Sequence, residues 1–123
     1  LIQGQPSLAM HDCSVYGSDY IPLQGNGDKK GLNAADIVVS CIAEGLSSDG
    51  INNSIRLSFP LSNGGAAEVA LASSASGVWS ASIPKFSQPI ASGSLANPTR
   101  FTFTAHRGSD NAQAVSYVSK VVR

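Results

Sequence analysis

Hydrophobic and polar residues alternate with a period of two along much of the chain after residue 36. The pattern is clearest at residues 55–59 and 101–105, where Ser, Thr or Arg occupies the positions between the hydrophobic ones. It continues at residues 79–83 and 115–122. Such alternation is typical of β-strands with one face in a core and the other in water. The best helix candidate, residues 32–43, contains three consecutive β-branched residues, which favour a strand.

Turn-forming residues separate these segments. They include Asp49-Gly50, Asn63-Gly64-Gly65, Ser76-Gly77, Pro84, Pro89, Pro98 and Gly108. Six or seven short strands with turns between them predict an all-β protein, an antiparallel β-sandwich of about seven strands.

The period of two also predicts the pairing of one hairpin. A three-residue turn at residues 63–65 would place Phe59 opposite Val69. A two-residue turn would place Phe59 opposite Glu68 and mix core and solvent positions on one face. We therefore expect the three-residue turn.

The first 36 residues lack sustained alternation. We expect a single domain over residues 1–123, with an irregular N-terminal segment at 1–36 and the main strands at 37–122. An edge strand is predicted near residues 14–16, followed by a long loop at 24–33. Because the chain begins with Leu1, we expect it to be a processed or excised piece of a longer protein.

Charge excludes some classes of partner. Charged residues make up only 13% of the chain, and 8 Lys and Arg balance 8 Asp and Glu, so the chain lacks the basic character of a nucleic-acid-binding protein. No run of about 18 apolar residues is present, so we expect no membrane span. The resulting Ser-, Thr- and Asn-rich surface is typical of secreted β-proteins.

The two cysteines, Cys13 and Cys41, are too few for a zinc site of the usual four-ligand kind. An even number in a Ser- and Thr-rich chain favours one disulfide and an oxidising compartment. Two buried thiols are the alternative. A Cys13–Cys41 disulfide would anchor the irregular segment to the predicted strand that contains Cys41.

Candidate catalytic and metal-binding residues are sparse. No Ser lies in a Gly-x-Ser-x-Gly motif, and alternation places His106 on a solvent-facing strand surface. Four oxygen-bearing residues, Asn26, Asp28, Asn33 and Asp36, lie close in sequence, but turns use the same residue types. We predict no catalytic residue, no metal, no cofactor and no enzymatic activity.

Aromatic residues are the remaining candidates for ligand contact. Trp79 alternates with Ala81 and Ile83 and is predicted to lie in the core. Tyr16, Tyr20 and Tyr117 are the better surface candidates, and stacking on sugars is the chemistry they would offer.

Residues 77–84, Gly-Val-Trp-Ser-Ala-Ser-Ile-Pro, resemble a recurring element of bacterial immunoglobulin-like repeats, in which a Gly-x-Trp turn leads into a strand that ends at Ile/Val-Pro. Residues 101–105, 109–112 and 118–122 resemble the last hairpin of those modules. The resemblance implies an Ig-like or fibronectin-type β-sandwich, a non-catalytic module of a bacterial surface protein, adhesin or phage virion protein.

These observations lead to three hypotheses of function. The first is an extracellular structural or adhesive module, on a cell or virion surface, that spaces, displays or attaches other domains. The second is a small glycan-binding module. The third is a self-assembling coat or pilus-like subunit whose N-terminal segment pairs with a neighbour's edge strand. The expected partners are neighbouring domains, copies of the chain, or a host glycan or protein.

Overall fold

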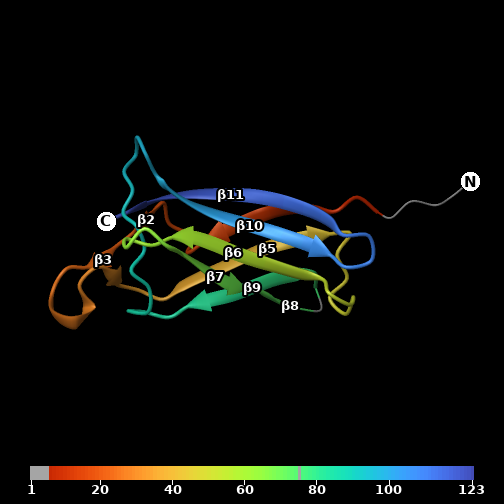
Figure 1. Ribbon diagram of the computed structural model, residues 1–123, viewed down its shortest axis with the longest axis horizontal. Coiled ribbons are helices and arrows are strands. Elements are labelled where there is room, and N and C mark those ends of the chain that lie inside the picture. The colour runs from red at the N-terminus through yellow and green to blue at the C-terminus, as the bar shows by residue number, and fades with distance from the viewer. Residues whose placement is uncertain (1–5, 75) are drawn as a thin grey trace, which may run out of the picture.

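A computed structural model describes residues 6–74 and 76–123 of the chain, which form an all-β fold (Figure 1). The described residues contain eleven strands in three sheets and one short 3₁₀ helix. The strands run roughly along the longest axis of the molecule (Figure 1). Among the described residues, no helix has the length and apolar character needed to cross a membrane.

The first sheet has four antiparallel strands in the order β1-β5-β9-β8. These are β1 (Ala9–Val15), β5 (Ile37–Glu44), β9 (Val78–Ile83) and β8 (Ala72–Ser73). Alternate residues of β5 are buried, as the period of two predicts for a strand with one face on a core.

The second sheet has five strands in the order β2-β11-β10-β6-β7. These are β2 (Tyr20–Ile21), β11 (Ala112–Val122), β10 (Thr99–Arg107), β6 (Ser54–Pro60) and β7 (Ala66–Ala70). The pairing of β2 with β11 is parallel, whereas the other pairings in this sheet are antiparallel.

The N-terminal segment contains more regular structure than the sequence predicts. β1 extends well to the N-terminal side of the predicted edge strand at residues 14–16. The predicted loop at 24–33 includes a 3₁₀ helix (Gly27–Lys29) and ends at β4 (Leu32–Asn33), which pairs with β3 (Leu23–Gln24). The strand number exceeds the predicted seven because β2, β3, β4 and β8 have only two residues each, too few to show a periodicity.

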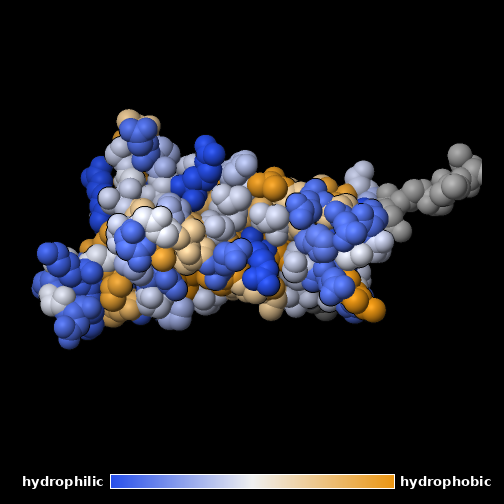
Figure 2. Space-filling model, in the orientation of Figure 1, coloured by the Kyte–Doolittle hydropathy of each residue, from blue (hydrophilic) through white to orange (hydrophobic). Residues whose placement is uncertain are grey.

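The inward faces of the two larger sheets contribute to one hydrophobic cluster, an arrangement compatible with a β-sandwich. β5 and β9 supply Ile37, Val39, Cys41, Trp79 and Ile83, while β6 and β10 supply Ile55, Leu57, Phe59, Phe101, Phe103 and Ala105. The burial of Trp79 confirms the prediction from its alternation. The face seen in Figure 2 is mainly hydrophilic or neutral, with its apolar residues in small separate patches.

The predicted register of the β6–β7 hairpin is wrong. Phe59 lies opposite Ala67 rather than Val69, and Leu57 lies opposite Val69. The turn keeps three residues but moves to positions 62–64, because the Leu61 amide donates to the Gly65 carbonyl at 2.8 Å. The Ser62 amide, which the predicted register would pair with Ala66, donates instead to the Pro89 carbonyl. The shift is by two residues, so the hydrophobic side chains stay on the same face.

Candidate functional site

An open pocket of about 800 Å³ lies at the end of the molecule where the described chain begins, on the right in Figure 1. Three segments line it: the N-terminal segment at Pro6, the β5–β6 loop at residues 45–53, and the β10–β11 turn at 107–109. Loops at the end of a rigid sandwich are common places for binding surfaces. We therefore take this pocket as the candidate site.

Arg107, the last residue of β10, holds the three segments together. Its side chain is only 7% exposed. Its Nε and Nη2 atoms donate to the two carboxylate oxygens of Asp110 at 3.0 and 2.8 Å. Its Nη1 atom donates to the carbonyl oxygens of Pro6 and Gly45 at 2.6 and 2.8 Å. We call this group of contacts the Arg107 clamp.

The clamp alters the protonation equilibria of its charged members. The hydrogen bonds from Arg107 are the largest effect and lower the pKa of Asp110 to about 2. The hydrogen bonds to Asp110 in turn raise the pKa of Arg107 above its ordinary value. Both groups are therefore charged at neutral pH, which keeps the clamp closed.

The loops around the clamp are fixed by further contacts. The Asn53 side chain donates to the Ser47 carbonyl at 3.0 Å and accepts a hydrogen bond from the Gly108 amide at 2.9 Å. Gly108 allows this approach because a Cβ atom there would collide with the Ile51 carbonyl oxygen. Ile51 itself is 84% exposed. The pocket thus offers an apolar rim above polar groups that are engaged in internal hydrogen bonds.

The three tyrosines selected from the sequence are exposed but occupy different elements. Tyr16 follows β1, Tyr20 begins β2, and Tyr117 lies in the middle of β11. The Arg100 guanidinium lies 4.8 Å from the centre of the Tyr117 ring. Among the described residues, no hydrogen bond or ring–ring contact joins the tyrosines, and none of them lines the pocket.

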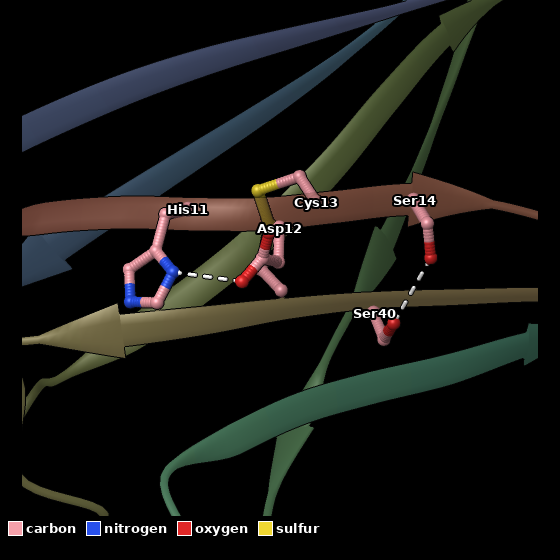
Figure 3. Close-up of a disulfide and its surroundings, with 6 residues drawn as sticks. His11, Asp12, Cys13, Ser14 and Ser40 are labelled. Atoms are coloured by element: carbon pink, nitrogen blue, oxygen red, sulfur yellow. Dashed lines mark hydrogen bonds and ion pairs between the residues drawn. A yellow bond between two sulfur atoms is a disulfide. The ribbon is translucent and has the colours of Figure 1, made fainter.

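The two cysteines form a disulfide between neighbouring strands, Cys13 on β1 and Cys41 on β5 (Figure 3). The β1–β5 register shifts between His11 and Ser14, and Asp12 has a positive φ of 53°. The disulfide therefore joins the edge strand to the sheet at a β-bulge. It is compatible with an extracellular location.

The histidines occupy strand surfaces. The His11 ring lies 3.0 Å from Asp12 Oδ2 (Figure 3). It also lies 3.6 Å from Glu44 Oε1, and both carboxylates are largely exposed. His106 is half-buried on the outer face of β10, where its Nδ1 lies 3.0 Å from the Asn52 carbonyl oxygen. Among residues 6–74 and 76–123, no three His, Cys, Asp or Glu side chains are arranged to hold a metal ion.

Asn33 has a role that the sequence reasoning missed. Its side chain is fully buried; it donates to the Ala35 and Pro84 carbonyls and accepts from the Ser87 and Gln88 amides. It therefore joins the β4 region to the loop after β9. No sequence signal separates this Asn from the turn-forming residues around it, because all its partners except Ala35 lie more than fifty residues away.

The same loop holds Phe86 in an unusual conformation. Phe86 has a positive φ of 62°, which is uncommon for a bulky residue. Its amide donates to the Asn33 carbonyl at 2.8 Å. The ammonium groups of Lys29 and Lys85 lie 4.5 and 4.8 Å from the centre of its ring. This surface lies at the opposite end of the molecule from the pocket.

No protein-family model matches the chain, and no curated protein matches its sequence.

Proposed function

We propose that the chain is a non-catalytic, extracellular Ig-like module that spaces, displays or attaches neighbouring domains on a cell or virion surface. The observation that carries the proposal is the position of the chain ends. The first described residues lie at one end of the elongated molecule and the C-terminus lies at the other (Figure 1). Domains joined to the two ends of such a module would be held apart by the length of its long axis.

The strand order supports the Ig-like part of the proposal. Immunoglobulin sandwiches place the first, second, fifth and fourth main strands, A-B-E-D, in one sheet and C, F and G in the other. If β1 and β5 are taken as A and B, β6 and β7 as C and C′, and β8 and β9 as D and E, the first sheet has the order A-B-E-D. β11-β10-β6-β7 then follows the order G-F-C-C′.

The Arg107 clamp supports a role in resisting tension between neighbouring domains. Arg107 belongs to a nine-residue strand of the second sheet, and it binds the backbone of Pro6 where the chain enters the fold. A charged hydrogen-bond network at that point fixes the direction of the incoming chain relative to the sandwich. Farther along, the Cys13–Cys41 disulfide ties the entering strand covalently to β5.

A non-catalytic role agrees with how the ionisable side chains are used. The carboxylate with the strongly lowered pKa, Asp110, is committed to Arg107. Asp36, in the loop considered for metal binding, accepts the Lys85 amide at 2.7 Å. The disulfide supports assignment of the module to an oxidising, extracellular compartment.

Pulling on single molecules by their two ends tests the proposal. We expect the oxidised chain to resist tension until one cooperative rupture. We expect Arg107→Met to release the N-terminal segment at lower force, because it removes the contacts to Pro6 and Gly45. Arg56→Met, which changes an exposed arginine on β6, is the matched control and should leave the rupture force unchanged. Gradual extension at low force without a cooperative event would contradict a spacer.

Glycan binding is the second candidate, and it is favoured by exposed aromatic rings beside cationic groups, as at Tyr117 and Arg100. The test is a panel of immobilised glycans probed with the chain at tens of micromolar. Binding to one sugar class that is lost in Tyr16→Ala, Tyr20→Ala or Tyr117→Ala would support this function. Absence of binding across the panel would argue against glycan binding and leave the spacer role as the proposed function.

A further inference from the structure

One side of β11 is open along most of its length. β10 pairs with β11 on one side, from Thr99 opposite Lys120 to Arg107 opposite Ala112. On the other side, β2 pairs only with Val121 and Val122. Within the described part of the chain, no strand pairs with residues 112–120 on that side. β1 runs near β11 but belongs to the other sheet, where its partner is β5 (Figure 1).

The backbone groups that face the open side can be identified from β2. The Val121 amide donates to the Asp19 carbonyl and the Arg123 amide donates to the Ile21 carbonyl, both on the β2 side. Because the direction of backbone groups alternates along a strand, residues 113, 115, 117 and 119 point their N–H and C=O groups to the same side. As far as the structure describes the chain, those groups form an unpaired edge.

Over residues 112–119 this edge lacks three features that usually prevent strand pairing: prolines, charged residues and bulges. Lys120, which follows, is buried, and its ammonium donates to the Ser18 carbonyl. Two large apolar side chains stand exposed on the strand, Val115 at 50% and Tyr117 at 59%.

We propose that this edge is a homophilic interface, at which β11 of a second copy pairs antiparallel with β11 about a twofold axis at Ser116. Val115 then lies opposite Tyr117 of the second copy, and Tyr117 lies opposite Val115 of the second copy. Each pair exchanges two backbone hydrogen bonds, because both residues point their backbone groups to the edge. Aromatic and β-branched residues opposite each other stabilise a sheet.

Neighbouring registers are less favourable. Centring the axis on residue 115 places Tyr117 opposite Gln113, and centring it on residue 117 places Val115 opposite Ser119. Only the axis at Ser116 covers both exposed apolar side chains with apolar partners. The interface is self-complementary, as a twofold contact requires.

The pairing would orient the two copies in a defined way. Because the strands are antiparallel and follow the long axis of the molecule, the long axes of the two copies run in opposite directions (Figure 1). Modules that project from two facing surfaces would meet in this orientation. The dimer proposal does not depend on the spacer role. The pulling experiment acts on one chain at a time, so it reports on the spacer role and not on association between chains.

Sedimentation of the full chain at increasing concentration, up to about 1 mM, tests the proposal. We expect a monomer–dimer equilibrium that Val115→Lys weakens by about tenfold or more, because it removes an apolar contact and brings like charges into diagonal positions. The double variant Val115→Lys with Tyr117→Glu should regain dimerisation, since each lysine then faces a glutamate of the second copy. Ala70→Lys, on the outer face of the opposite edge strand β7, should dimerise as the wild type does.

Circular dichroism and thermal unfolding of each variant establish that it is folded. A folded wild-type chain that stays monomeric up to about 1 mM would overturn the proposal. A dimer that Val115→Lys leaves intact would also overturn it, because the contact would then lie elsewhere. Failure of the double variant to recover would overturn the register, since the introduced lysine and glutamate face each other only with the axis at Ser116.

Discussion

The guanidinium of Arg107 and the carboxylate of Asp110 form a two-point contact, with hydrogen bonds of 3.0 and 2.8 Å, across the turn that joins β10 to β11. The Asp110 carboxylate also accepts the amide of Ala112 at 3.2 Å, where β11 begins. The Nη1 atom of Arg107 binds the backbone of the N-terminal segment and of the β5–β6 loop. One ion pair thus organises the end of the molecule that contains the pocket.

The contribution of this ion pair to the free energy of unfolding is expected to be lost at acidic pH. The folded-state pKa of Asp110, about 2, lies below the ordinary value of 3.8. The contribution is therefore complete above about pH 4 and is lost as the pH falls through about 2. We expect wild type to be more resistant to urea than Asp110→Asn at pH 6, with the difference shrinking at pH 2. Both proteins share every other carboxylate, so an equal difference at both pH values would contradict the prediction.

Replacing Asn33 should destabilise the fold well beyond an ordinary surface substitution. Asn33→Ala removes a buried side chain that binds four backbone groups, two carbonyls and two amides. We expect a loss of about 3 kcal/mol in the free energy of unfolding. Asn97→Ala, at an exposed asparagine, is the control and should change it by less than about 0.5 kcal/mol. Urea unfolding measures both, and equal losses would show that the Asn33 contacts contribute little.

Trp79 should behave as a core residue in spectroscopy and in mutagenesis. It is 4% exposed, and its indole Nε1 has no hydrogen-bond partner among the described residues. We expect blue-shifted fluorescence that iodide quenches poorly. Trp79→Ala should cost about 3–5 kcal/mol. Trp79→Phe should cost less, because it keeps most of the apolar volume and removes the unpaired N–H. Complete quenching by iodide would instead place Trp79 at the surface.

Removing the disulfide should destabilise the fold, because the unfolded chain gains conformational freedom when the bridge is absent. The bridge closes a loop with a sequence separation of 28 residues, which gives about 3.5 kcal/mol on chain-entropy grounds. Urea unfolding with and without reductant measures this difference, and Cys13→Ser should match the reduced wild type. Intact mass after alkylation under denaturing conditions checks the bridge itself. Labelling of both cysteines without reductant would show that they are free.

Tension offers a second measurement of the same bond. In the oxidised chain, the residues between Cys13 and Cys41 are bypassed by the disulfide and cannot extend. Reduction should therefore lengthen the fully unfolded molecule by about 95 Å, at about 3.4 Å for each residue released. An unchanged length after reduction would contradict a bridged chain.

Much of the second sheet follows from the local pattern of residues. At residues 55–59 of β6 and 101–105 of β10 every second side chain is hydrophobic, so the alternation predicts both the strand and its buried face. The even number of cysteines likewise favoured the bridge that joins β1 to β5. The hairpin register could not be predicted in this way, because residues 89–91, distant in sequence, bind the backbone at residues 60–62.

The sequence by itself determined that the chain forms strands with one apolar face, because side-chain direction in a strand depends only on position along it. The same pattern determined that Trp79 enters the core. Tertiary structure alone decided the rest. It brought Arg107 to Pro6 and Gly45 and bound Asn33 to backbone groups more than fifty residues away. Within residues 6–74 and 76–123, it also left one side of β11 unpaired over residues 112–120. Those features depend on which segments become neighbours when the sheets assemble, and a local pattern of residues does not contain that information.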